Sequence, residues 1–277
     1  MSKSLEDDEL READFAVCQK LIYKHTGIHY PYEKRKLLQN RLRKRMRVLR
    51  LASFADYLAH LRGAGARDEL QQFLNVITTN ETYFFRCQRH WDFFRSWIVE
   101  RRPLLVGPRR LRIWSAAAST GAEAYTMAIV LQQELGAAAL AKVEIVATDV
   151  NDAVLREARE GRFRGYAISQ TEPEVVARWF RRTGDDHYQI DPRLQRMVQF
   201  RVHNLQQPMR GGPFDLVFLR NVMIYFDAKS KEHVLRHVHD VLVPDGYLLV
   251  GESESLLSLQ HGFDYVRPSL FRRADAS

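Results

Sequence analysis

The spacing of apolar residues changes near residue 80, which predicts two architectures in one chain. Between residues 5 and 77, apolar positions recur with helical periodicity and no convincing strand is found. From residue 111 onward, short apolar runs typical of buried strands alternate with helical segments; the runs are LRIWSA, VEIVATDV, MVQFRVHN, FDLVFLRN and YLLVGES. Helices are expected between them at 122–135, 152–159 and 229–242.

The second part is predicted to be a doubly wound, mostly parallel α/β sheet, because apolar strands that alternate with helices are typical of a sheet covered on both faces. After residue 161 the polar stretch TGDDHYQIDP interrupts this rhythm, and it is either a short hairpin or an ordinary loop on the fold. We place a small inserted antiparallel β subdomain at about 183–203. The expected organisation is an all-helical N-terminal domain at 1–78, a linker at 79–102 and the sheet domain at 103–277.

Positive charge is concentrated in the helical part. The chain has 42 Lys and Arg against 34 Asp and Glu, and much of this excess lies in residues 33–51. Within that segment Leu38, Leu42, Met46 and Leu49 form an apolar stripe at helical spacing, so an amphipathic, strongly basic helix is predicted. Its basic face is either simply solvated or docks an acidic partner, and charge alone does not say whether that partner is protein, nucleic acid or lipid.

Composition narrows the class of protein. A chain of 277 residues that is 45% hydrophobic can build a core without a disulfide or a metal. Its two cysteines, Cys18 and Cys87, fit no metal-ligand spacing and favour a reducing compartment. No run approaches the roughly 20 apolar residues of a membrane span. We expect a cytoplasmic protein that does not span a membrane and binds no metal.

The loop after the first predicted strand has the features of a cofactor site. Residues 115–121, SAAASTG, contain nothing larger than threonine, so a ligand can approach the backbone closely. The pattern G-x-G-x-x-G is missing, which disfavours a dinucleotide. Asp149 ends the second predicted strand, where a carboxylate can bind ribose hydroxyls, although it could also be a helix N-cap. Together these features indicate S-adenosylmethionine.

Four ordered motifs carry a resemblance to a known family. They are NETYFFR at 80–86, WSAAASTGAEAYTMA at 114–128, ATDVNDAVLREAREGRF at 147–163 and FDLVFLRNVMIYFD at 214–227. The chain resembles the chemotaxis receptor methyltransferases of the CheR type. This resemblance implies a sheet of the S-adenosylmethionine methyltransferase type. It also implies methyl transfer to glutamate side chains of transmembrane chemoreceptors, which leaves S-adenosylhomocysteine.

The resemblance also implies which residues bind the cofactor. It assigns Glu123 to the methionine ammonium and Asp149 to the ribose. Ala122 and Ala124 stand where the family usually has an acidic residue and a proline, and we expect altered affinity at most. The remaining residues that it implies are Asn80, Thr82 and Arg86 in the linker, Ala117 in the loop, Asn204 and Leu205 beside the adenine, and Arg220, Asn221 and Val222 after the fourth strand.

Catalysis and docking are predicted from the same resemblance. A glutamate carboxylate is already ionised near neutral pH, so the enzyme mainly has to align it with the methyl group, and Arg102 and Tyr225 are the candidates for this role. Helix 33–51 is expected to dock the cytoplasmic methylation helices of chemoreceptors through Arg41, Arg43, Arg45 and Arg47. The short, glycine-poor hairpin predicts independence from a receptor C-terminal peptide.

Two other functions remain open from the sequence. An S-adenosylmethionine-dependent RNA methyltransferase would share the sheet, the Asp149 site and a basic domain, although no nucleic-acid partner is expected here. A non-catalytic signalling adaptor that binds S-adenosylmethionine would keep the ligand residues without turnover. A large, salt-dependent affinity for RNA would favour the first function, and cofactor binding without methyl transfer would favour the second.

Overall fold

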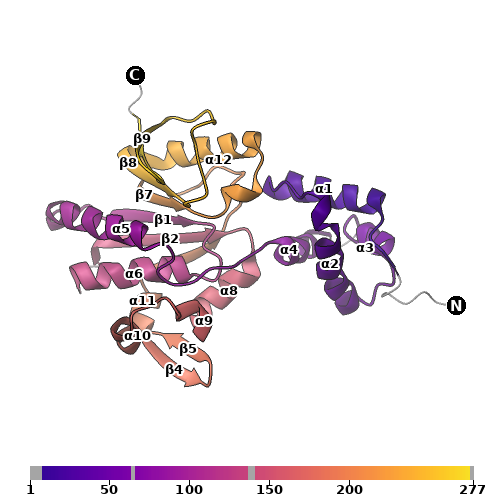
Figure 1. Ribbon diagram of the computed structural model, residues 1–277, viewed down its shortest axis with the longest axis horizontal. Coiled ribbons are helices and arrows are strands. Elements are labelled where there is room, and N and C mark those ends of the chain that lie inside the picture. Colours follow the sequence, from indigo (N-terminus) through magenta and orange to yellow (C-terminus); the bar gives the residue numbers. More distant parts are fainter. Residues whose placement is uncertain (1–7, 64–65, 137–140, 275–277) are drawn as a thin grey trace.

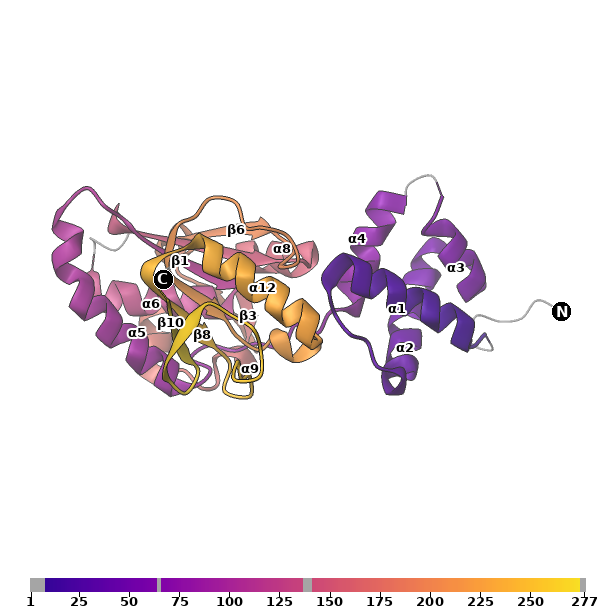
Figure 2. The same cartoon turned by 90° about the horizontal axis from the view of Figure 1, so that it is seen from above.

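The N-terminal part is a helical domain with its own core (Figure 2). The computed structural model describes residues 8–63, 66–136 and 141–274, so residues 1–7 and 275–277 of the predicted domains lie outside the described residues. Leu38, Leu42 and Met46 of the predicted apolar stripe are buried in this core, and Leu49 is partly buried against it. The helices are α1 (Glu12–Thr26), the 3-10 turn η1 (Tyr32–Lys34), α2 (Arg35–Leu49), α3 (Phe54–His60) and α4 (Ala66–Ile77).

The second part is built on a seven-stranded sheet in the order β6-β2-β1-β7-β8-β10-β9 (Figure 1). The first five of these strands are mutually parallel, and β10 and β9 pair antiparallel at the edge. Because β1 lies between β2 and β7, the winding reverses beside β1, which is where open α/β sheets bind ligands. The strands are β1 (Leu111–Ala116), β2 (Val143–Asp149), β6 (Val198–Val202), β7 (Phe214–Leu219), β8 (Leu242–Val250), β9 (Phe263–Arg267) and β10 (Leu270–Arg273).

Helices cover both faces of this sheet. Successive strand residues point to opposite faces, so Ile113 packs into one core with Trp91 while Trp114 packs into the other with Leu235. The first core holds α5 (Gln88–Arg101) and α6 (Ala122–Leu135), and the second holds α12 (Ala228–Val241). The remaining segments of this layer are α8 (Asp152–Glu160), which contacts β2 and β6, and the 3-10 turns η2 (Arg102–Val106) and η3 (Met223–Tyr225).

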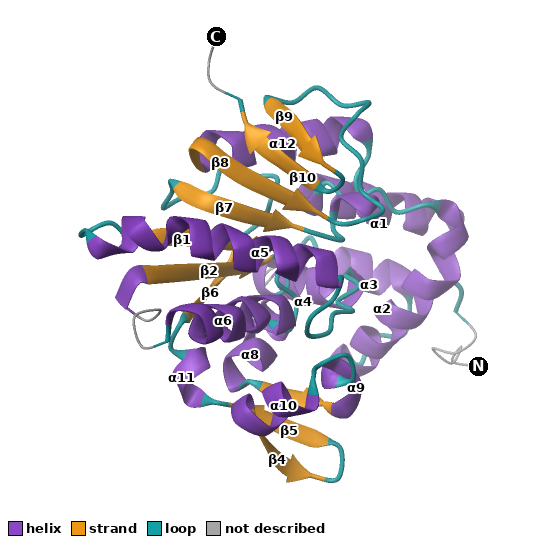
Figure 3. Cartoon of the chain, turned by 60° about the vertical axis from the view of Figure 1, so that its left-hand side comes forward, coloured by secondary structure: helices purple, strands orange, loops and turns teal. Residues whose placement is uncertain are grey.

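A separate three-stranded antiparallel sheet projects from the large one (Figure 3). Its order is β3 (Arg162–Arg164), β5 (His187–Ile190) and β4 (Phe180–Gly184), with the short helices α9 (Gly165–Ile168), α10 (Pro173–Trp179) and α11 (Pro192–Gln195) around it. The range of 183–203 predicted for the small β subdomain was therefore wrong, because its three strands lie between residues 162 and 190. Residues 198–202 form β6 of the large sheet instead, and β3 is too short to show an alternating pattern in the sequence.

The small sheet is held by aromatic contacts between residues far apart in the sequence, which local sequence patterns do not predict. Phe163 of β3 and Phe180 of β4 both pack edge-on against Phe84 of the linker, with ring centroids 4.8 and 5.0 Å away.

In the part of the chain that the structure describes, no helix has the length and apolar character needed to cross a membrane.

Candidate functional site

A pocket lies between the helical domain and the carboxyl ends of β1, β2, β6 and β7. The helical domain contributes the end of α1, η1, α2 and residues 77–78 at the end of α4, and the linker contributes residues 79–83 and Arg86. The structure brings together all the residues that the sequence assigned to the cofactor, and Tyr225 lies beside them. The predicted residues that line this pocket are Asn80, Thr82, Arg86, Ala117, Glu123, Asp149, Asn204, Leu205, Arg220, Asn221, Val222 and Tyr225.

The loop after β1 is sharply bent rather than glycine-rich. Ala117 and Ser119 have φ values of 66° and 52°, and Gly121 has 87°. Positive φ is uncommon for residues other than glycine, and such strain concentrates at ligand sites. A Cβ on Gly121 would lie 3.0 Å from both Ala158 and Phe200, so the one glycine of the loop sits where a side chain would crowd its neighbours.

Asp149 holds this loop and faces the pocket. Its carboxylate accepts hydrogen bonds from the backbone N–H of Ser119 at 2.8 Å and of Asn151 at 2.9 Å. Burial raises the pKa of this carboxyl, and the backbone N–H groups oppose the shift. The N-cap of α8 is Asn151, which accepts from the N–H groups of Ala153 and Val154, so Asp149 is not the helix cap. Each carboxylate oxygen keeps a lone pair for a ligand hydroxyl.

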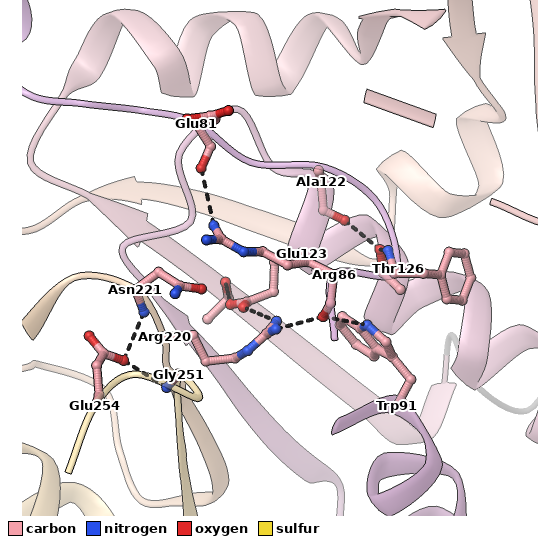
Figure 4. Close-up of polar contacts among 12 residues, drawn as sticks. Glu81, Arg86, Trp91, Ala122, Glu123, Thr126, Arg220, Asn221, Gly251 and Glu254 are labelled. Atoms are coloured by element: carbon pink, nitrogen blue, oxygen red, sulfur yellow. Dashed lines mark hydrogen bonds and ion pairs between the residues drawn. The ribbon is translucent and has the colours of Figure 1, made fainter. Parts of the chain in front are cut away.

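Glu123, in the first turn of α6, forms a buried ion pair with Arg220 after β7 (Figure 4). Nη1 of Arg220 donates to the carboxylate at 2.9 Å, and the Ser115 hydroxyl donates to it at 2.7 Å. Nη2 of Arg220 donates to the Arg86 carbonyl at 2.6 Å. Burial raises the pKa of Glu123, while the Arg220 charge opposes that rise. This network joins the linker, α6 and the loop after β7 into one wall.

The two domains are tied together around the pocket by side-chain amides and backbone groups. The Asn151 amide donates to the Asn75 carbonyl at 3.0 Å, and the Asn204 amide donates to the His25 carbonyl at 2.5 Å. The backbone N–H of His29 donates to the Tyr225 carbonyl at 2.8 Å. The helical domain therefore helps to fix the loop that carries Tyr225.

Arg102 does not belong to this site, so its predicted catalytic role was wrong. It lies at the end of α5 and donates to the Glu134 carbonyl at 2.6 Å and to the Glu134 carboxylate at 3.3 Å. The 14 residues of α5 carry the chain about 20 Å along the helix axis from the linker. Of the two arginines that flank α5, Arg86 at its other end is the one that lines the pocket.

Arg41, Arg43 and Arg45, which were predicted to dock a partner, have hydrogen-bond partners within the chain. Arg41 donates to the Ile77 carbonyl and to the Thr79 hydroxyl, and Arg43 donates to the Asp8 carbonyl. Nε and Nη2 of Arg45 both donate to the Glu69 carboxylate, and the shortest of these hydrogen bonds joins Nη2 and Oε2 at 2.6 Å. These arginines flank the buried stripe of α2, so their guanidinium groups reach the rest of the chain. The exposed basic side chains of α2 are Lys36, Lys44 and Arg47.

Glu254 is a residue of this site that sequence analysis missed. It is buried and accepts backbone hydrogen bonds from the loop after β7, including that of Asn221 at 2.8 Å (Figure 4) and that of Val222 at 2.9 Å. The sequence GESES at 251–255 gives no indication of this role. A buried carboxylate that accepts from backbone groups leaves no local signature, because its partners in the loop after β7 are 30 to 33 residues away.

The winding reversal beside β1, the small-residue loop and the strand-end aspartate define an S-adenosylmethionine-dependent methyltransferase domain. Two family models match the chain. The model described as CheR methyltransferase, SAM binding domain matches residues 80–270, and the model described as CheR methyltransferase, all-alpha domain matches residues 13–78. The chain belongs to the CheR methyltransferase family, which confirms the resemblance and the predicted fold class.

Curated relatives agree along nearly the whole chain. The chemotaxis protein methyltransferase of Salmonella typhimurium is 37% identical over 259 residues, which cover 92% of this chain and 88% of that relative. The chemotaxis protein methyltransferase of Borreliella burgdorferi is 32% identical over 260 residues, 92% of each chain. Chemotaxis protein methyltransferase 2 of Pseudomonas aeruginosa is 38% identical over 258 residues, 90% of this chain and 88% of that relative. The chain is therefore an S-adenosylmethionine-dependent methyltransferase of chemotaxis.

Proposed function

We propose that this protein transfers a methyl group from S-adenosylmethionine to glutamate carboxylates on the cytoplasmic methylation helices of chemoreceptors. The observation that carries the proposal is one pocket lined both by two carboxylates, Asp149 and Glu123, and by Tyr225, Arg86 and residues of the basic helical domain. The carboxylates suit a cationic nucleoside, and the basic residues suit an acidic acceptor. S-adenosylmethionine would supply the electrophilic methyl group, so the acceptor carboxylate needs no base to be reactive.

The proposed cofactor contacts follow from the residues around the pocket. Asp149 would accept hydrogen bonds from the ribose hydroxyls, and Glu123 would face the methionine ammonium. The loop after β1 would admit the ligand because Ala117 and Ser119 offer little bulk. Among the described residues, no group of three or more His, Cys, Asp or Glu side chains is placed to hold a metal ion.

Arg86 takes the place of Arg102 in the proposal as the cation that orients the acceptor. Arg220 is buried with Glu123, and Arg41 is bound to the linker. The Arg86 guanidinium makes one long hydrogen bond, 3.4 Å to the Glu81 carbonyl, and lies 5.6 Å from the Tyr83 ring centroid. A weakly held guanidinium can hold a carboxylate in line without a tight ion pair. Tyr225, at the end of η3, would assist through its hydroxyl.

Labelled S-adenosylmethionine and receptor-containing membranes test the proposal. Mild base should release labelled methanol, because it hydrolyses carboxyl methyl esters. Parallel reactions with RNA separate the rival enzyme class. Label that stays on protein or on RNA after base treatment would contradict the proposed chemistry, and cofactor binding without any transfer would indicate an adaptor.

Cofactor affinity is expected to fall as the pH is lowered. Burial raises the pKa of Glu123 above 4.5 and that of Asp149 above 3.8. An ionised Glu123 is needed to hold the ammonium, and an ionised Asp149 accepts the ribose hydrogen bonds most strongly. Affinity is therefore full above the raised pKa values and falls below them, by up to about tenfold per pH unit for each group. Calorimetric titration with S-adenosylhomocysteine across a pH series measures this dependence. In Glu123→Gln, the part of the pH dependence that comes from Glu123 should be absent. A constant affinity down to about pH 4 would contradict it.

Receptor docking by α2 is proposed to use its exposed lysines. Replacing both Lys36 and Lys44 with glutamine should raise the receptor KM several-fold at low salt, because long-range attraction to an acidic surface is lost, and the effect should shrink as salt screens the charges. A matched control removes Arg110 and Arg196, which are exposed and lie near the amino ends of β1 and β6. Equal KM values for both double variants would argue against α2 as the docking surface.

Independence from a receptor tail remains part of the proposal. Exposed positions of β4 are mostly polar, with Arg181, Arg182 and Thr183 in sequence, so they offer an extended peptide few apolar anchors. Methylation rates of one receptor with and without its C-terminal peptide should agree within about twofold, since no tether raises the effective concentration. Micromolar binding of the isolated peptide together with a many-fold rate loss on its removal would overturn this expectation.

A further inference from the structure

The loop that follows β7 is held by one carboxylate from a distant segment. Oε2 of Glu254 accepts hydrogen bonds from the N–H groups of Asn221 at 2.8 Å and Gly251 at 2.7 Å. Oε1 accepts from Val222 at 2.9 Å, Met223 at 2.7 Å and Ile224 at 3.3 Å. Five backbone donors therefore converge on a side chain that is only 8% exposed.

The shape of this loop explains why it needs an anion. Asn221 has a φ of 58°, and this left-handed turn directs successive N–H groups to one side. Such a concave array of donors is an anion-binding geometry, and here the protein fills it with its own carboxylate. Without Glu254 these N–H groups would lose their acceptor in a buried environment, which a backbone segment avoids by changing conformation.

The residues that depend on this loop are the ones that face the reaction. Asn221 and Val222 line the pocket, and Tyr225, which also lines it, ends the 3-10 turn η3 that follows them. Asp149 ends β2 and Glu123 lies in the first turn of α6, and their hydrogen bonds go to residues other than Glu254. Displacement of the loop would therefore move Tyr225, together with Asn221 and Val222, while leaving the cofactor contacts proposed for Asp149 and Glu123 in place.

We infer that Glu254 is a positioning residue for methyl transfer, which acts through the backbone of residues 221–224 to fix Tyr225. This inference rests on the proposed function and adds a residue to its site. Glu254 itself touches neither substrate, because its carboxylate is occupied by the five backbone donors. Its effect should therefore be on the turnover step rather than on cofactor affinity.

Glu254→Gln is the direct test, because glutamine keeps the size but can accept at only one of the two positions. We expect kcat to fall roughly tenfold or more, corresponding to about 1.4 kcal/mol, while the dissociation constant for S-adenosylhomocysteine changes less than threefold. The matched control is Glu252→Gln in the same segment, since Glu252 is half exposed and pairs with the exposed Arg89. That control should retain wild-type kcat.

Gly251→Ala provides a second variant if Glu254→Gln folds poorly. A Cβ at this position would lie 2.6 Å from the Glu254 carboxylate and 3.0 Å from the Asn221 amide, so it should displace the same loop and lower kcat. Combining Glu254→Gln with Tyr225→Phe should cost less than the product of the two single effects, because both act on one group. Full multiplicativity would contradict action through Tyr225.

Hydrogen exchange separates this inference from the proposed function. Amides in a peptide spanning residues 220–226 should exchange faster in Glu254→Gln than in Glu252→Gln, whether or not receptors are substrates. Failure of the wild-type enzyme to methylate receptor glutamates would refute the proposed function alone. Unchanged exchange, or a kcat within twofold of wild type when expressed per folded molecule, would overturn the role of Glu254.

Discussion

Asp149→Ala is expected to weaken cofactor binding by at least two orders of magnitude. Two ribose hydroxyls would lose charge-assisted hydrogen bonds worth roughly 1.5–3 kcal/mol each. The same carboxylate accepts from the N–H groups of Ser119 and Asn151, so the substitution also removes the anchor of the loop after β1. We therefore expect the free energy of unfolding to fall by about 1–3 kcal/mol as well. Calorimetric titration and denaturant unfolding measure the two effects.

Asp152→Ala is a suitable control for this substitution. Asp152 begins α8, accepts from Asn75 at 2.7 Å, and does not line the pocket. Its loss should change stability modestly and leave cofactor affinity within a fewfold of wild type. If Asp149→Ala binds S-adenosylhomocysteine as tightly as Asp152→Ala does, Asp149 has no part in the cofactor site.

Arg220→Met is expected to destabilise the fold by about 3–5 kcal/mol near neutral pH, because it leaves the Glu123 carboxylate buried without its cation. The pKa of Glu123 is raised by burial, and the loss of Arg220 removes the charge that opposes this rise. A folded-state pKa above the unfolded one gives stability that is present at low pH and lost as the pH rises. The deficit of Arg220→Met should therefore shrink as the pH approaches 4.5, the ordinary value for a glutamate.

A double variant distinguishes the ion pair from simple packing. Adding Glu123→Gln to Arg220→Met removes the buried charge, so most of the lost stability should return while cofactor binding stays weak. Denaturant unfolding at several pH values measures the first result, and calorimetry measures the second. A deficit for Arg220→Met that does not depend on pH, or that the second substitution fails to relieve, would contradict this account of the pair.

The sequence was sufficient to predict the architecture because the signals involved are local. Apolar strands alternate with helices after residue 111, and Asp149 is the last residue of β2, so its position at the carboxyl edge of the sheet follows from chain order. The stripe of α2 was visible for the same reason. The residues of the pocket gather because parallel strands end at one edge, which needs no knowledge of tertiary contacts.

What could not be predicted depends on contacts between distant residues. Arg102 and Arg86 are both arginines flanking α5, and only packing shows which of them reaches the pocket. The direction of the α2 arginines depends on partners such as Glu69, more than 20 residues away. From the sequence alone, Glu254 would be predicted to be an ordinary surface acid, because its backbone partners are not known. The small sheet was misplaced because β3 contributes only one buried residue, Phe163.

The central claim is methyl esterification of receptor glutamates, and peptide mass spectrometry tests it most directly. A receptor cytoplasmic fragment should be incubated with the enzyme and S-adenosylmethionine, digested, and sequenced by fragmentation. The account predicts a base-labile methyl group on glutamate side chains of the receptor's helices, absent when Asp149→Ala replaces the wild-type enzyme. Methylation confined to another residue type, or an unmodified receptor with an enzyme that binds the cofactor, would contradict it.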